Sequence, residues 1–77
     1  MPRTQIWYES EDGVDHEVDK KIKKIASSFG STKVKAEYWK APGYRYLTFT
    51  FRDEIDAEQF GDTVHDRIGG MIEWEIL

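Results

Sequence analysis

Few side chains in this sequence are of the types that carry chemistry. There is no cysteine, and the histidines are His16 and His65. Disulfides, thiolate nucleophiles, zinc ribbons and iron–sulfur ligation are therefore excluded. His65 and Asp62 are one helical turn apart, a spacing that allows two side chains to share a metal ion. Solvated charges on a helix are the simpler interpretation of this pair, and we expect no metal site.

The acidic segment Glu9-Ser10-Glu11-Asp12-Gly13 is the second candidate for chemistry. It lacks the alternating oxygen ligands of a calcium loop. Its charge would repel phosphate at the place where acylphosphatase-like enzymes need an arginine in an anion cradle. A glycine-rich phosphate loop, a nucleophile elbow and paired-carboxylate spacing are not evident either. We therefore expect no enzymatic activity and no cofactor, and interpret the acidic residues as helix-cap charge.

Length and composition are those of one small folded domain covering residues 1–77. Hydrophobic residues make up 39% of the chain and aromatic residues 14%, which is enough apolar material to fold. The absence of cysteine favours the cytoplasm. The sequence has no apolar run of the roughly 20 residues that a membrane span needs, and its first residues do not resemble a signal peptide.

The net charge of −4 is unevenly distributed. Residues 1–52 carry ten Lys and Arg against seven Asp and Glu, whereas residues 53–77 carry one against eight. This balance does not indicate a strongly basic nucleic-acid binder. It is compatible with an acidic surface that meets a basic partner.

Periodicity predicts six elements that would position these residues. Strands are predicted at residues 4–9, 32–40, 44–52 and 71–77, from alternation of apolar and polar side chains. A helix capped by Asp12 or Asp15 precedes Gly30, and a second begins near Asp53 or Asp56 and ends at Gly69-Gly70. Their apolar stripes are Val18, Ile22, Ile25, Ala26 and Phe29 in the first helix, and Ala57, Phe60, Val64 and Ile68 in the second.

The order strand, helix, strand, strand, helix, strand predicts an α+β fold. Two right-handed crossovers joined by a hairpin give a ferredoxin-like βαββαβ two-layer sandwich, with antiparallel sheet order 4-1-3-2 and both helices on one face. Gly61 beside the second stripe is expected to allow close approach to the sheet. Residues expected to face the helices are Ile6, Tyr8, Val34, Ala36, Tyr38, Leu47, Phe49, Phe51, Ile72, Trp74 and Ile76.

The opposite parity predicts what the uncovered face of the sheet carries. Trp7, Tyr44 and Tyr46 should gather there, because the first and third strands are neighbours. A small domain rarely exposes such a group without a function, although the rings and Thr48 would also serve as ordinary cross-strand pairs. The remaining residues expected on this face are Lys33, Lys35, Glu37, Trp39, Thr50, Glu73 and Glu75.

Gly43-Tyr44-Arg45-Tyr46-Leu47-Thr48-Phe49 resembles the third-strand consensus of the RNA-recognition-motif family, and Ile6-Trp7-Tyr8 resembles its first-strand consensus. The resemblance implies that Trp7, Tyr44 and Tyr46 stack on bases of single-stranded RNA or DNA. The sequence departs from the family at Pro42, where a basic residue is usual, and at Arg45, where a small one is. Glu73 and Glu75 would also repel phosphate beside Trp7.

A protein interface is the alternative that we favour, because Tyr and Trp are enriched in interfaces. The partner would be another protein or a second copy on the open sheet face, or a chain paired to an edge strand. We predict a small adaptor or inhibitor, of the kind found among phage proteins such as anti-CRISPR proteins. Its predicted binding face is Trp7, Trp39, Tyr44, Tyr46, Thr48, Lys33 and Lys35. Its predicted acidic surface, which would oppose a basic groove, is Glu54, Asp56, Glu58, Asp62 and Asp66.

Overall fold

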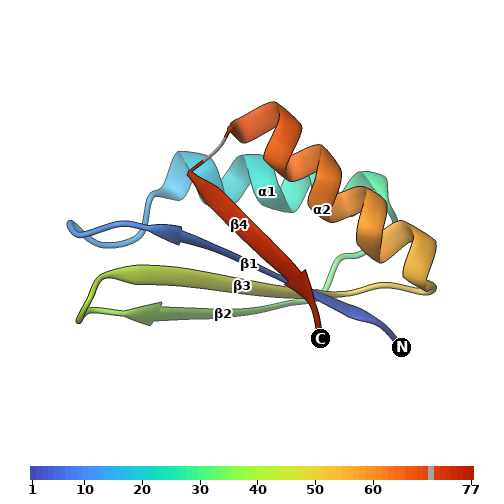
Figure 1. Ribbon diagram of the computed structural model, residues 1–77, viewed down its shortest axis with the longest axis horizontal. Helices are drawn as coiled ribbons and strands as arrows, with labels where there is room; N and C mark the ends of the chain where they lie inside the picture. The colour runs from blue at the N-terminus through green and yellow to red at the C-terminus, as the bar shows by residue number, and fades with distance from the viewer. Residues whose placement is uncertain (70) are drawn as a thin grey trace.

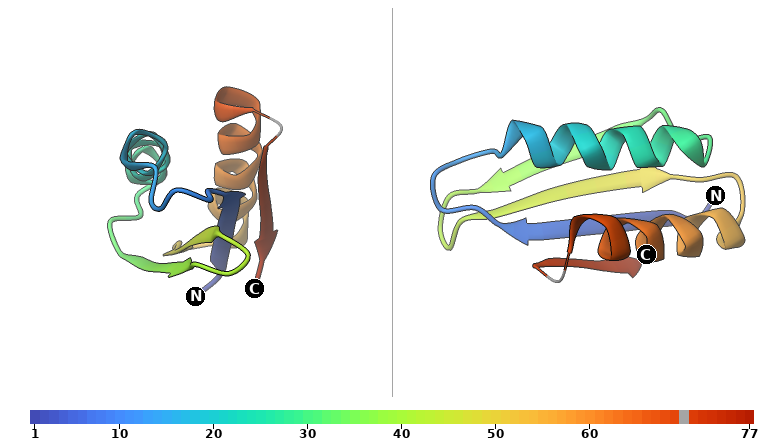
Figure 2. Two further views of the ribbon diagram at one scale, coloured as in Figure 1. Left: turned by 90° about the vertical axis from the view of Figure 1, so that its left-hand side faces the viewer. Right: turned by 90° about the horizontal axis from the view of Figure 1, so that it is seen from above.

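The computed structural model describes residues 1–69 and 71–77 and contains the six predicted elements. The four strands form one antiparallel sheet in the order β2-β3-β1-β4, with α1 and α2 on the same side of it (Figures 1 and 2). The ferredoxin-like α+β fold is therefore confirmed. The elements are β1 (Arg3–Glu9), α1 (His16–Ser28), β2 (Val34–Trp39), β3 (Tyr44–Thr50), α2 (Glu54–Ile68) and β4 (Ile72–Ile76).

Side-chain caps determine where the helices begin. The Asp15 carboxylate accepts hydrogen bonds from the first-turn amides of α1, and Asp53 accepts one of 2.9 Å from the Asp56 amide at the start of α2. The structure thus selects Asp15 over Asp12 and Asp53 over Asp56. α2 ends at Gly69, whose φ of 114° suits glycine; Gly70, also predicted to end the helix, lies outside the described residues.

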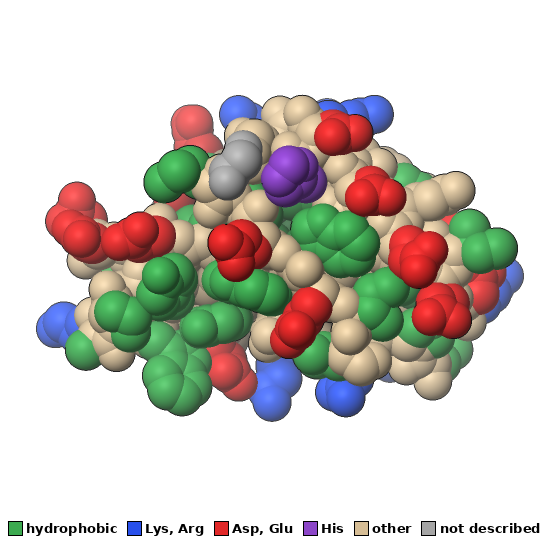
Figure 3. All heavy atoms as spheres, in the orientation of Figure 1, with side chains coloured by type: hydrophobic (Ala, Val, Ile, Leu, Met, Phe, Trp, Pro, Cys, Tyr) green, Lys and Arg blue, Asp and Glu red, His purple; other side chains and the backbone are tan. Residues whose placement is uncertain are grey.

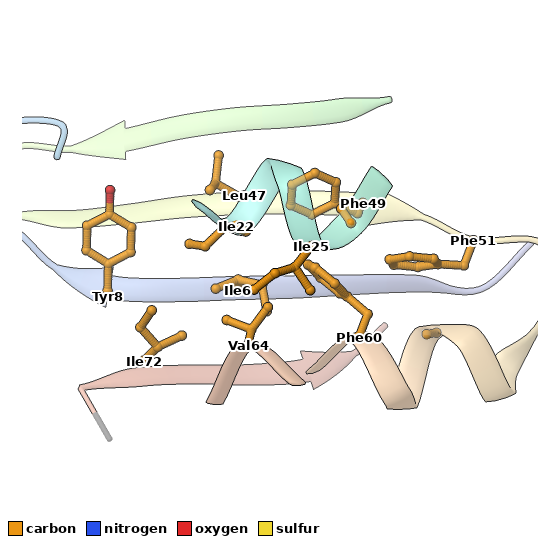
Figure 4. Packing of buried hydrophobic residues seen from close by; sticks show 12 residues of the cluster. Ile6, Tyr8, Ile22, Ile25, Leu47, Phe49, Phe51, Phe60, Val64 and Ile72 are labelled. Carbon is orange, nitrogen blue, oxygen red and sulfur yellow. The ribbon is translucent and has the colours of Figure 1, made fainter. Parts of the chain in front are cut away.

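The core lies between the helices and the central strands β1 and β3 (Figure 4). The Phe60 ring of α2 contacts two rings, one in β3 and one directly after it. Its centroid is 5.1 Å from that of Phe49 and 5.0 Å from that of Phe51. Burial alternates along β1 and β3 as predicted. The buried cluster is Ile6, Tyr8, Ile22, Ile25, Ala26, Leu47, Phe49, Phe51, Ala57, Phe60, Val64 and Ile72.

Strand β2 departs from the prediction. Val34 and Ala36 were expected beneath the helices, but both are exposed. β2 is an edge strand of the sheet, and none of its residues belongs to the buried cluster. The apolar residues of the helices therefore pack against the other strands, and Val34 and Ala36 remain open to solvent.

A buried carboxylate ties α1 to the sheet. Asp19 of α1 is 4% exposed and accepts two hydrogen bonds from the Arg45 guanidinium, of 3.1 Å from Nε and 2.8 Å from Nη2. The Tyr8 hydroxyl donates to its other oxygen at 2.5 Å. Burial, and then the hydrogen bond to Asp19, raise the pKa of Tyr8 above its ordinary value, so the hydroxyl keeps its proton and remains a donor.

Replacing Asp19 tests this network. Asp19→Asn should lower the free energy of unfolding by roughly 3 kcal/mol, because it leaves the Arg45 charge buried without its counter-ion. Asp62→Asn, the same change at an exposed position of α2, should stay within about 0.5 kcal/mol of the parent. Urea denaturation measures both. Equal losses in the two variants would contradict the role assigned to Asp19.

Helix α2 lies close to the sheet. The buried Thr4 hydroxyl donates to the Ala57 carbonyl at 2.9 Å, which links β1 directly to the helix backbone. One turn further along, Gly61 is buried against the indole of Trp74 in β4, and a Cβ at that position would overlap the ring. The close approach predicted for Gly61 is therefore confirmed.

The fit between Gly61 and Trp74 predicts opposite effects of one substitution in two backgrounds. Gly61→Ala should destabilise the parent by about 1–3 kcal/mol through overpacking, despite the better helix propensity of alanine. In a Trp74→Leu background the same change should stabilise by up to about 1 kcal/mol, because the ring is gone. Thermal and urea unfolding measure both effects. Stabilisation in the parent would show that the indole does not limit this position.

Candidate binding face

The side of the sheet away from the helices, called the open face here, is organised by strand register. Trp7 of β1 pairs with Tyr46 of β3 on one side and with Glu73 of β4 on the other. Glu37 of β2 pairs with Tyr46 from the opposite side. These residues therefore form one row across the sheet, with two rings in the middle and a carboxylate at each end.

Four rings gather at one end of the open face, and we call them the aromatic cluster: Trp7, Trp39, Tyr44 and Tyr46. Tyr46 is central, with ring centroids 6.4 Å from Trp7, 6.2 Å from Trp39 and 6.3 Å from Tyr44. Trp39 is 57% exposed and the other three are half-buried. The rings support one another in tilted and edge-on contacts, so they form a stable apolar surface open to a partner.

Carboxylates border the aromatic cluster. Glu9 pairs with Tyr44, and Glu9, Glu37 and Glu73 are all exposed. The Trp39 indole N–H donates to Glu37 at 3.4 Å. A hollow of about 210 Å³ is lined by Trp7 and Tyr44 together with Glu9 and Glu73, and by Tyr8 and Met71. Ring faces and carboxylates both attract cations, so this end of the open face suits a positively charged group.

The other end of the open face has the opposite charge. A hollow of about 300 Å³ there is lined by Arg3, Lys33, Val34, Lys35, Thr48 and Thr50. Gln5 lies between the two ends and donates to the Thr48 hydroxyl at 3.4 Å. Lys35 also pairs with Glu37 along β2, with its Nζ 3.5 Å from a carboxylate oxygen. The open face is thus polarised, basic at one end and aromatic with an acidic border at the other.

The predicted binding face is divided by this polarity. Its rings, Trp7, Trp39, Tyr44 and Tyr46, lie together, whereas Thr48, Lys33 and Lys35 lie around the second hollow. No sequence pattern marks Glu9 or Arg3 as parts of these sites. Alternation alone puts both on the open face, but only the pairings Glu9–Tyr44 and Arg3–Thr50 reveal their neighbours.

The predicted acidic surface lies in the helix layer. Glu54, Glu58, Asp62 and Asp66 are exposed at four-residue intervals along α2, and Asp56 is half-buried. Figure 3 shows acidic side chains along the side of the molecule that carries α2. Since α2 covers the other face of the sheet, this acidic row and the aromatic cluster lie on different layers. A single flat partner surface cannot contact both fully.

Other chemistry finds little support in residues 1–69 and 71–77. In that part of the chain no three acidic or histidine side chains are grouped so that they could hold a metal ion. Neither helix there combines the length and apolarity required to traverse a bilayer. His65 and Asp62 are both exposed on α2.

Comparison with known proteins finds no family model that matches this chain, and no curated protein that matches it. The ferredoxin-like topology therefore stands on the structure, and the resemblance to the RNA-recognition motif on the short strand patterns alone.

The acidic border of the aromatic cluster predicts a bias among charged fluorescence quenchers. A Trp74→Phe variant leaves Trp7 and Trp39 as the fluorescent tryptophans. Caesium should quench their fluorescence more than iodide does, when each quencher is normalised to its effect on free tryptophanamide. The reason is that the carboxylates concentrate cations near the rings. Adding Glu37→Gln and Glu73→Gln should reduce the bias. Stern–Volmer titrations at low ionic strength measure it. A preference for iodide would contradict the local negative potential.

Proposed function

We propose that this chain is a non-enzymatic protein-interaction domain, whose aromatic cluster binds a basic segment of a partner protein. The observation that carries this proposal is the coincidence of four rings with a carboxylate border. Rigid rings contribute contact area at small entropic cost. The carboxylates select against acidic partners, since like charges brought together at an interface are costly.

The hollow between Trp7, Tyr44, Glu9 and Glu73 supports a specific mode of binding. An arginine or lysine side chain entering it would place its charge beside two carboxylates, and its stem or guanidinium plane against the rings. An arginine gains more than a lysine, because its planar fork matches a carboxylate with two hydrogen bonds. We therefore expect the partner segment to present an arginine at this place.

An inhibitor is one form of this proposal. The exposed acidic row of α2, at Glu54, Glu58, Asp62 and Asp66, would oppose a basic groove such as one that holds nucleic acid. Because the row lies in the helix layer, it would act on a second part of the partner, or on a different partner from the one on the open face.

Binding of single-stranded nucleic acid is the second candidate. The basic end of the open face favours it, because Arg3, Lys33 and Lys35 offer positive charge next to the rings. The nearest charged neighbours of the rings argue against it. Trp7 pairs with Glu73, and Tyr46 pairs with Glu37, so a backbone following the stacked bases would meet carboxylates.

Titration of tryptophan fluorescence with short peptides tests the proposal. An arginine-containing peptide should bind more tightly than its lysine counterpart, and an acidic peptide should not bind. Glu73→Gln should weaken binding about fivefold, equivalent to roughly 1 kcal/mol. Glu75→Gln is the matched control on the same strand: Glu75 pairs with Gln5 rather than with a ring, and its loss should change affinity by less than about twofold.

The same titration with an oligouridine distinguishes the second candidate. Salt-sensitive oligonucleotide binding that Tyr46→Ala abolishes, together with no peptide binding, would replace the protein proposal with the nucleic-acid one. Equal effects of the two glutamate substitutions on peptide binding would show that only overall charge is sensed. That result would contradict the proposal that a basic side chain of the partner binds in the hollow.

A further inference from the structure

Strand β2 is an edge that the rest of the described chain leaves uncovered. It pairs with β3 on one side, and the described residues place no strand on its other side. Five of its six residues are exposed, on both faces of the sheet. Val34 is 36% exposed and Trp39 57%. A row of free backbone amides and carbonyls flanked by apolar side chains is a template for another strand.

We infer that β2 pairs antiparallel with β2 of a second copy of this chain, joining two four-stranded sheets into one. The inference rests on the edge strand and is independent of what the aromatic cluster binds. The occupant is indicated by charge, because the segment Lys33-Val34-Lys35-Ala36-Glu37-Tyr38-Trp39 is complementary to its own reverse.

Symmetry restricts the register of such a pair. A two-fold axis normal to the sheet keeps each face on its own side, so only residues of equal parity lie opposite each other. With the axis at Ala36, Lys35 lies opposite Glu37 of the second copy, twice. An axis at Lys35 or at Glu37 would instead place two like charges directly opposite each other, which is destabilising. Ala36 is therefore the favoured centre.

The remaining pairs of this register are also complementary. On the open face, Lys33 lies opposite Trp39 of the second copy, a cation beside an exposed indole. On the helix side, Val34 lies opposite Tyr38, and Ala36 opposite its own copy. The exposed apolar side chains of β2 thus gain cross-strand neighbours.

The polarity of the whole open face agrees with this arrangement. Antiparallel joining at β2 sets the basic end of one copy, with Lys33 and Lys35, beside the aromatic and acidic end of the other, with Glu37 and Trp39. The result is one continuous helix-free surface that carries two aromatic clusters. Two linked sites of this kind would bind a repeated or dimeric partner with avidity.

Charge exchange tests both the interface and its register. In sedimentation equilibrium the parent should dimerise, whereas Lys35→Glu and Glu37→Lys should each raise the dimer Kd by about tenfold or more, because both cross-strand pairs become repulsive. The double variant carrying both changes should dimerise like the parent. An equimolar mixture of the two single variants should form a heterodimer, since each then meets its opposite charge.

Controls separate this interface from the others. Glu75→Lys, on the opposite edge strand β4, should leave the dimer unchanged, and so should Tyr46→Ala, although the latter should abolish peptide binding. A parent that stays monomeric up to about 1 mM overturns the inference. A dimer unaffected by the single β2 variants, or one that the double variant fails to restore, overturns the interface or its register. Circular dichroism confirms that each variant is folded.

Discussion

The buried carboxylate of Asp19 determines which side chains of β1 and β3 face the helices and which lie on the open face. Tyr8 of β1 and Arg45 of β3 are direct partners in the register, and both reach Asp19 on α1. A slip of β3 by one residue would move Arg45 to the other face and leave the Asp19 charge buried alone, at a cost of several kcal/mol. A slip of β1 would remove the Tyr8 hydrogen bond from the same carboxylate. Tyr8 and Arg45 face the helices to bind Asp19. Their chain neighbours Trp7 and Tyr46 therefore lie on the open face.

The surfaces available for binding follow from how little the helix layer covers. α2 approaches β1 and β4 closely through Thr4, Gly61 and Trp74, and Asp19 links α1 to β1 and β3. Within the part of the chain that the structure describes, the open face and the β2 edge then remain without cover. An apolar surface of this kind is a liability unless a partner occupies it.

Charge is arranged locally in a way that the net value of −4 conceals. Lysines and an arginine occupy one end of the open face, carboxylates border the rings at the other, and acidic residues follow α2. Such segregation guides orientation more than it adds affinity. It also explains how one face can attract a basic side chain at one end while presenting complementary charge to a second copy along β2.

Element order, the alternation of β1 and β3 and the helix stripes were readable from the sequence, because each is set by residues near one another in the chain. The sequence also predicted a close approach at Gly61, but not that its neighbour is Trp74. Tertiary structure alone decided the rest. Val34 and Ala36 of the edge strand are exposed. Asp15 and not Asp12 caps α1, and Asp19, which no pattern singled out, is the buried partner of Arg45. Register placed Glu9, Glu37 and Glu73 beside the rings. The physical reason is that periodicity indicates only which face a side chain occupies, whereas its neighbours depend on packing between segments far apart in the chain.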